Sequence, residues 1–78
     1  MRRITIRTTH DEPERVARAV RPDNTPEMTT RSDDDRVVTT IERESTGGLR
    51  TTADDYVVNL TVADEVVQLS DRTDESKP

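Results

Sequence analysis

A seven-residue apolar repeat in the C-terminal part of the chain constrains the fold more than any other feature. Its members recur at alternating steps of four and three residues: Leu49, Ala53, Tyr56, Leu60, Ala63 and Val67. This spacing aligns their side chains along one side of an amphipathic helix. The chain as a whole is very polar, so this apolar side has to be buried against another surface.

A strand is the alternative for this segment, because residues 56–62 also alternate between apolar and polar side chains. We prefer a helix because the repeat is longer than an ordinary strand. In addition, Asp54 and Asp55 lie where carboxylates complement the amino terminus of a helix. Gly47 and Gly48 just before the repeat predict a sharp turn into this last element.

The first third of the chain predicts a strand followed by a helix. Residues 3–8 alternate between apolar and polar side chains, as in a half-buried strand. Asp11 and Glu14 then form a capping-box pattern, and apolar residues recur at helical spacing until Pro22. We expect this helix to cover residues 11–21.

The middle of the chain predicts a hairpin of two strands. Residues 27–32 form a weak strand whose only large apolar side chain is Met28, so it should lie at an edge of the sheet. Residues 37–42 alternate more strongly. The aspartates at 33–35 between these strands predict a solvated turn.

The resulting order, β-α-β-β-α, belongs to the α+β class. We expect a three-stranded antiparallel sheet with two helices on one face, forming a single domain over residues 1–70. The sequence SDRTDESKP after Leu69 has nothing to bury, so residues 71–78 are expected to form a disordered acidic tail.

The hydrophobic core of this domain is thin, because only 28% of the 78 residues are hydrophobic. A domain of this size buries a small fraction of its surface even with an ordinary composition. We therefore expect a second copy, a partner or a special solvent to stabilise the fold, with a homodimer as the first expectation.

The balance of acidic and basic residues indicates the salt concentration in which the protein works. Acidic residues outnumber basic ones by 17 to 12, and Lys77 is the only lysine. This composition is expected in cytoplasm near saturating salt, where ions screen repulsion between carboxylates and salt strengthens apolar burial. We interpret the chain as halophilic and archaeal; the alternative is a small acidic protein with this composition by chance.

No pattern in the sequence indicates catalysis, a cofactor or a metal site. His10 is the only histidine, and we interpret it as a solvated loop residue. The aspartates at 33–35 lack the ligand spacing of a calcium loop, and the glycine pair does not form a phosphate loop. There is no cysteine, and no stretch resembles a signal peptide or a membrane span. We expect a noncatalytic, soluble, cytoplasmic protein.

Six arginines crowd the first 21 residues: Arg2, Arg3, Arg7, Arg15, Arg18 and Arg21. The net charge of −5 opposes contact with phosphates, and Tyr56 is the only aromatic residue available for stacking on bases. We therefore do not expect the isolated chain to bind tRNA, although these arginines can add a basic face to a larger tRNA site.

Three segments, taken in their order and spacing, resemble one known family. They are RPDN at 21–24, the strand-like VVTTIERE at 37–44, and LRTTADDYVVNL at 49–60. Together they resemble the small dimerising Pcc-type subunit (CTAG/Pcc family) of the KEOPS complex, in haloarchaeal form, over residues 3–69. That complex makes threonylcarbamoyl-adenosine in tRNA. The acidic tail and the scarcity of lysine depart from many relatives, and we attribute them to adaptation to salt.

The resemblance implies a noncatalytic scaffold that forms a homodimer and docks the ATP-dependent catalytic subunit of KEOPS through its helical surface. Contact with tRNA would then be indirect, through the complex. The family's loop matches Pro22, Asp23 and Asn24, and its final helix matches Leu49, Arg50, Asp54, Asp55, Asn59 and Leu60. The expected partner-binding residues are Leu49, Arg50, Ala53, Asp54, Tyr56, Val57 and Leu60.

Two other classes of function stay open. An orphan halophilic interaction domain of the same topology would form a homodimer but would not bind KEOPS subunits. A small regulatory nucleic-acid binder would need its arginines on one contiguous face.

Overall fold

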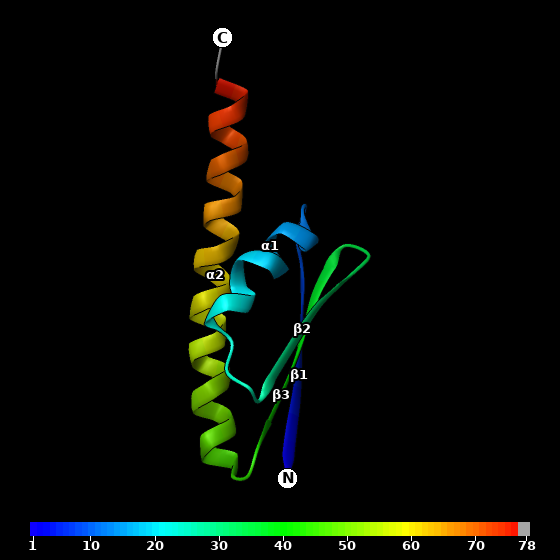
Figure 1. Cartoon of the computed structure of the whole chain (residues 1–78), viewed down its shortest axis with the longest axis vertical. Coiled ribbons are helices and arrows are strands. Elements are labelled where there is room, and N and C mark those ends of the chain that lie inside the picture. Colours follow the sequence, from blue (N-terminus) through cyan, green and yellow to red (C-terminus); the bar gives the residue numbers. More distant parts are fainter. Residues whose placement is uncertain (77–78) are drawn as a thin grey trace.

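The computed structural model describes residues 1–76, with side chains through Leu69 (Figure 1). It confirms the β-α-β-β-α order and the three-stranded antiparallel sheet. The elements are β1 (Arg2–Thr9), α1 (Pro13–Val20), the 3₁₀ turn η1 (Arg21–Asp23), β2 (Met28–Asp33), β3 (Arg36–Arg43) and α2 (Thr46–Ser76).

β3 lies at the centre of the sheet and pairs antiparallel with both neighbours, in the order β1-β3-β2. Its ladder with β1 runs without interruption, from Arg2 opposite Arg43 to Thr9 opposite Arg36. β2 is shorter and pairs with the same stretch of β3 on the other side. Both β1 and β2 are therefore edge strands.

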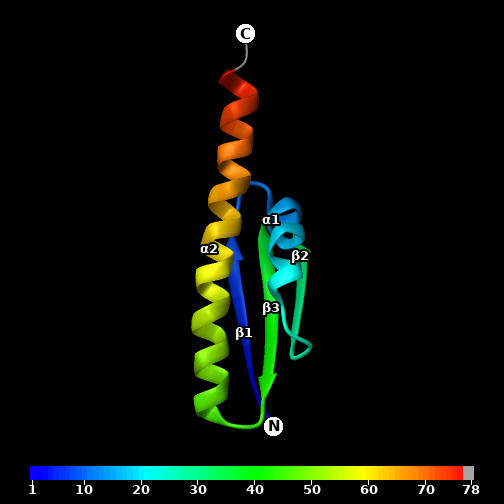
Figure 2. The same ribbon diagram turned by 60° about the vertical axis from the view of Figure 1, so that its left-hand side comes forward.

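Both helices lie on the same face of the sheet, and this face carries the residues of the apolar core (Figure 2). The buried Val38 of β3 lies on the opposite face, between Arg7 and Arg31. Ile4 and Ile6 of β1 lie there opposite Ile41 and Thr39 of β3. α2 packs over β1 and β3, whereas α1 packs over β3 and β2. The buried apolar cluster consists of Val16, Ala17, Val20, Val37, Ile41, Tyr56, Leu60, Ala63 and Val67.

The apolar repeat is confirmed as the buried side of α2. Four of its six members belong to the core, and the other two, Leu49 and Ala53, are half-buried against it. Residues 56–62 are helical throughout, so the strand alternative for this segment is excluded. A helix is favoured over a strand because it places all six residues of the apolar repeat against the core, whereas a strand over residues 56–62 would bury only some of them.

The predicted start of the first helix was wrong. α1 begins at Pro13, with Glu12 as its N-cap and no side-chain hydrogen bond from that residue to the helix. The predicted capping box of Asp11 and Glu14 is therefore not formed. Proline at the first helical position has its fixed φ already in the helical range, so it sets the start of the helix without a capping side chain.

The predicted glycine turn was also wrong. α2 begins at Thr46, so Gly47 and Gly48 lie in its first turn, and neither has a positive φ. The Ser45 side chain caps this end by accepting a hydrogen bond from the Gly48 N–H (3.0 Å). At Gly48 a Cβ would approach the Ser45 Oγ and the Arg43 guanidinium at 3.1 and 3.3 Å, so the absence of a side chain keeps this corner compact.

The left-handed backbone lies instead at Asp34, in the turn between β2 and β3, where φ is 56°. Aspartate tolerates this conformation better than most residues other than glycine. The main chain of this turn also holds the end of β1, since the His10 N–H donates to the Asp35 carbonyl (2.8 Å).

α2 continues to Ser76, about 46 Å at 1.5 Å per residue, and its upper part rises past the end of the sheet in Figure 1. The expected domain boundary at residue 70 and the disordered tail at 71–78 stay predictions. No side chain beyond Leu69 is described, and residues 77–78 lie outside the described part of the chain.

Candidate interaction surfaces

A buried chain of hydroxyl groups connects the loop after α1 to the middle of α2. The Asn24 Nδ2 donates to the Thr30 Oγ1 (2.6 Å), and the hydroxyls of Thr30 and Thr39 are 2.8 Å apart. The Thr39 Oγ1 donates to the Tyr56 hydroxyl (2.5 Å). One member of the family-matching loop, Asn24, is thus fixed to β2, and through it to β3 and α2.

Burial raises the pKa of the Tyr56 phenol above its ordinary value, because desolvation penalises the charged phenolate. Hydrogen bonds with Thr39 and Thr30 partly oppose this rise. The phenol is therefore neutral in the folded protein at physiological pH, and its role is structural.

A groove of about 210 Å³ lies between α1, η1 and α2. Asp23 of the family-matching loop and Asn59 of the family-matching helix both line it, although 36 positions separate them in the sequence. The other lining residues are small or branched and apolar: Ala19, Val62, Ala63 and Val66. The structure thus brings together two segments that the sequence matched separately.

A row of exposed valines borders this groove. Val58, Val62 and Val66 recur every fourth residue along α2, and each is more than half exposed. A contiguous row of exposed apolar side chains is typical of a surface that contacts another molecule, and it is unusual in a chain with so few apolar residues. Sequence reasoning missed it, although the four-residue spacing beside an already buried stripe was a usable signal.

The seven expected partner-binding residues separate into two groups. Tyr56 and Leu60 are buried in the core, and Leu49 and Ala53 are half-buried against it. The remaining three, Arg50, Asp54 and Val57, are exposed. Only this second group is fully accessible to another protein, whereas Tyr56 and Leu60 are not accessible without rearrangement. In the family-matching loop, Pro22 and Asp23 are exposed and Asn24 is half-buried.

His10 is not the solvated loop residue that the sequence suggested. Its side chain is 7% exposed, and its Nδ1 lies 2.8 Å from the Asp64 Oδ1 on α2. Its Nε2 lies 2.6 Å from the Thr8 Oγ1. The partner Asp64 is 54 positions away in the sequence, so no local pattern revealed the contact.

The order threonine, histidine, aspartate has the connectivity of a nucleophile with its base and orienting acid. Here the ring of His10 is almost completely covered, so a substrate has no access to it. The arrangement therefore fastens α2 to the end of β1.

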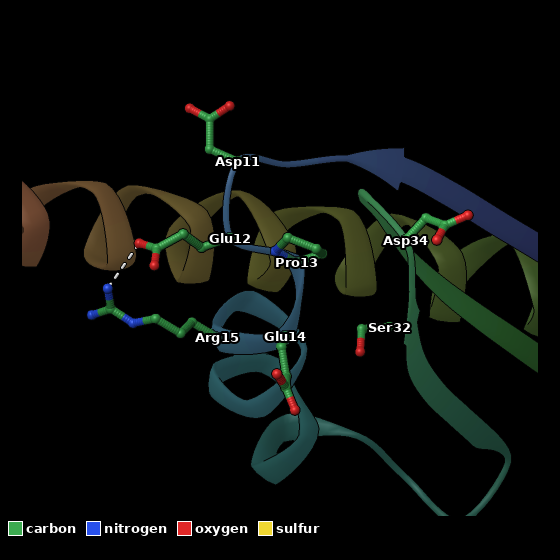
Figure 3. A pocket seen from close by; sticks show the side chains of 7 residues that line it. All are labelled: Asp11, Glu12, Pro13, Glu14, Arg15, Ser32 and Asp34. Atoms are coloured by element: carbon green, nitrogen blue, oxygen red, sulfur yellow. Dashed lines mark hydrogen bonds and ion pairs between the residues drawn. The ribbon is translucent and has the colours of Figure 1, made fainter.

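The carboxylates at the upper end of the molecule do not converge on a common point. A cavity of about 350 Å³ lies there, where the loop before α1 faces the β2–β3 turn. Figure 3 shows Glu12 turned toward Arg15, whose Nη1 is 2.8 Å from the Glu12 Oε2, while Asp11 and Asp34 point away from each other. Among the described residues, no group of three or more acidic or histidine side chains is placed to hold a metal ion.

The open face of the sheet carries four arginines: Arg3, Arg7, Arg31 and Arg36. Three of them lie near carboxylates, with Arg3 at 3.5 Å from Glu42, Arg31 at 3.3 Å from Asp33 and Arg36 at 3.9 Å from Asp35. This pairing lowers the positive potential that a phosphate backbone would meet.

The six arginines of the first 21 residues do not form one surface. Arg3 and Arg7 lie on the open face of the sheet, whereas Arg2 lies on the same face as Ile4. Arg15 and Arg18 lie on α1 beside acidic residues. Arg21 donates from its Nε to the Thr30 carbonyl (3.2 Å). The structure therefore divides the basic cluster that the sequence suggested.

Within the described residues, no helix has both the length and the apolar character needed to cross a membrane. Comparison of the chain with protein-family models, with curated proteins and with solved structures finds no match.

Proposed function

We propose that this protein is a noncatalytic, dimerising scaffold subunit of a KEOPS complex, and that it supports threonylcarbamoyl-adenosine modification of tRNA by docking the catalytic subunit. One observation carries the proposal: Asp23 and Asn59 line the same groove, beside the exposed valines. Two of the three segments whose sequences resemble the family, residues 21–24 and 49–60, each contribute one residue to the lining of this groove.

The chemistry of the groove fits an amphipathic helix of the catalytic subunit. The walls are themselves helices, and small residues such as Ala19 and Ala63 allow a third helix to approach closely. Val62 and Val66 offer apolar area, whereas Asp23 and Asn59 offer polar groups at the rim. This division between an apolar centre and a polar edge is typical of protein interfaces.

A noncatalytic role agrees with the state of the titratable groups. His10 is covered, Tyr56 is buried with a raised pKa, and the carboxylates of the upper end diverge. The chemistry would then belong to the catalytic subunit, and this chain would contribute binding and geometry.

The experiment is capture of the catalytic KEOPS subunit by the Val62→Arg variant in multimolar KCl, followed by light scattering. We expect at least tenfold weaker capture, because an arginine in the row places a charge where apolar contact forms. Val62 is 55% exposed, so the circular dichroism of the variant should match the parent. Undiminished capture by Val62→Arg would exclude the groove, and failure of the parent to bind would refute the KEOPS proposal.

The two alternative classes give different results in the same setting. An orphan interaction domain would be dimeric but would leave the catalytic subunit in solution. A nucleic-acid regulator would bind tRNA as the isolated chain, with an affinity that falls steeply as salt is raised. The open face of the sheet, with four arginines, is the surface on which that second alternative depends.

A further inference from the structure

His10 connects three elements at the upper end of the molecule. Its backbone N–H donates to the Asp35 carbonyl in the β2–β3 turn (2.8 Å), so the hairpin holds its main chain. Its ring lies between Thr8 of β1 and Asp64 of α2, at 2.6 and 2.8 Å from their side-chain oxygens. Only 7% of the side chain is exposed, so the ring is closely packed. The ring is therefore held in one position relative to the sheet, and its contact with Asp64 fixes α2 at that level.

The contact with Asp64 is a hydrogen bond in either charge state of the ring. An ionised carboxylate is only an acceptor, so the Nδ1 of His10 carries the hydrogen and donates it. The Thr8 hydroxyl accepts from the Nε2 of a charged ring and donates to the Nε2 of a neutral one. The second oxygen of Asp64 accepts from the Gln68 Nε2 (2.8 Å), which holds the carboxylate along the helix. The connection from β1 to α2 thus consists of short, directed contacts.

Side-chain hydrogen bonds attach α2 to the sheet and to His10 at three successive heights, at Thr52, Tyr56 and Asp64. Asp64 is the highest of the three. It lies at the level where β1 has ended and α2 begins to rise past the sheet (Figure 2). Of these three attachments, the one at Asp64 therefore has the most influence on the tilt of the upper part of α2.

Asp64 and the groove lie on opposite sides of α2. Val62 and Val66, which line the groove, are each two residues away from Asp64. Two residues turn a helix by about 200°, so both valines point about 160° away from Asp64. His10 therefore holds α2 from one side, and the groove toward α1 lies on the other.

The lining of the groove favours its closure. Ala19 of α1 and Ala63 and Val66 of α2 border a space of about 210 Å³. Movement of the two helices toward each other would remove apolar surface from water and improve the packing between them. Alanine side chains also permit a close approach of two helices. A groove of this kind stays open only if α2 is held away from α1.

We propose that His10 is a positioning residue that keeps the groove open, because it holds α2 through Asp64 from the side opposite α1. When this hydrogen bond is lost, the upper part of α2 moves toward α1, the groove narrows, and Val66 becomes partly covered. The width of the groove does not depend on the identity of the partner. The consequence for docking rests on the proposed function: a partner that needs an open groove binds less well once the bond is lost.

Two substitutions of His10 separate positioning from the filling of space. The amide nitrogen of asparagine can take the place of the Nδ1, so His10→Asn keeps a donor for Asp64. The longer glutamine places its amide near the position of the Nε2, so His10→Gln keeps the contact with Thr8 and loses the one with Asp64. Glutamine fills more of the space of the ring than asparagine. A residue that only fills space is therefore replaced better by glutamine, and a residue that positions α2 is replaced better by asparagine.

The first test is the reaction of a single thiol in the groove of this cysteine-free chain. Val66→Cys places the thiol at a lining position whose parent side chain is 54% exposed. In multimolar KCl, we expect N-ethylmaleimide to react at least fivefold more slowly when His10→Gln is added, because α1 then covers the thiol. Addition of His10→Asn should change the rate less than twofold, and circular dichroism should be the same for all three chains. Equal rates with His10→Gln and His10→Asn, or a faster reaction with His10→Gln, would overturn the proposal.

Asp64→Ala and Asp64→Asn test the same hydrogen bond from the side of α2. Both remove one charge, but asparagine keeps a carbonyl oxygen that accepts from the Nδ1 of His10. A slower reaction of the thiol is therefore expected for Asp64→Ala alone. Asp55→Ala, at an exposed position of the same helix, is the control for the loss of a carboxylate. If His10→Gln and Asp64→Ala both fail to fold, the contact is a requirement for folding, and the positioning role is overturned.

Capture of the catalytic KEOPS subunit measures the consequence for docking. We expect His10→Gln to weaken capture at least fivefold and His10→Asn to retain it, in step with the thiol rates, although His10 does not line the groove. A parent that does not bind refutes the proposed function, and the thiol rates still decide whether His10 keeps the groove open. A parent that binds, together with unchanged capture by His10→Gln, overturns the role of His10 in docking.

Discussion

Tyr56 brings the only phenol of the chain into the centre of the core, where its hydroxyl meets a row of threonine hydroxyls instead of water. No buried side-chain polar atom among the described residues lacks a hydrogen-bond partner. A fully paired polar chain in a thin core fixes the relative positions of β2, β3 and α2, which apolar contacts alone leave less specified.

Tyr56→Phe should therefore destabilise the protein by about 1–2 kcal/mol at pH 8, because the Thr39 hydroxyl loses its buried acceptor. The pKa of this phenol is raised on folding, so its stabilising contribution is complete below the unfolded value of about 10 and is lost as pH rises through the folded value. In urea titrations, the difference between parent and variant should shrink above pH 10. A difference that is constant to pH 11 would contradict the raised pKa.

At the scale of the element, α2 presents three sides that differ in their burial and in their neighbours. One side is the buried repeat, a second carries the valine row beside the groove, and a third carries Val57. A mutation on α2 should therefore affect folding when it lies on the buried side, and contacts with other molecules when it lies on an exposed side. Of the three sides, the buried one is required for folding.

Leu60→Asp should abolish folding, because it buries an unpaired carboxylate at a position that is 5% exposed and removes apolar contact from the middle of the helix. The cost is several kcal/mol in a domain with little stability to spare. Thr61→Asp is the matched control, since its neighbouring side chain is exposed, and its thermal transition should stay near that of the parent. A folded Leu60→Asp chain by circular dichroism would refute this account of the core.

The sequence was sufficient to predict the helices and strands, but not the contacts between segments that are distant in the chain. Periodicity predicted α2 and the strands because burial on one side leaves a period of 3.6 or 2 in the chain. The contact of His10 with Asp64, and the position of Asp23 and Asn59 on one groove, leave no period in the sequence because each involves distant segments. The glycine pair led to a wrong prediction of a turn, because glycine also occurs in the first turn of a helix. At Gly48 a side chain would crowd Ser45 and Arg43.

At the scale of the whole molecule, acidic residues cover a chain with a small apolar core, and the net charge is −5. Concentrated salt screens the repulsion between exposed carboxylates and strengthens apolar burial. Both effects act on the same balance, so the folded state should depend on salt more strongly than that of an ordinary domain.

Dilution from multimolar KCl to below about 0.1 M, where the Debye length reaches ~10 Å, should unfold the protein or loosen it. Far-UV circular dichroism would record the loss of helix, and restored salt should recover it. A matched titration with sucrose, which strengthens burial without screening charge, separates the two causes. An unchanged spectrum at low salt would remove the halophilic interpretation.

The threonines buried in the fold have a thermal consequence. Thr30, Thr39 and Thr52 occupy positions that hydrocarbon side chains would fill in a richer core. Unfolding then exposes less apolar and more polar surface, and these two kinds of surface change the heat capacity in opposite directions. We therefore expect a small heat-capacity increment of unfolding and a shallow curve of stability against temperature. The thin core that should make this protein dependent on its solvent should also make it tolerant of cooling.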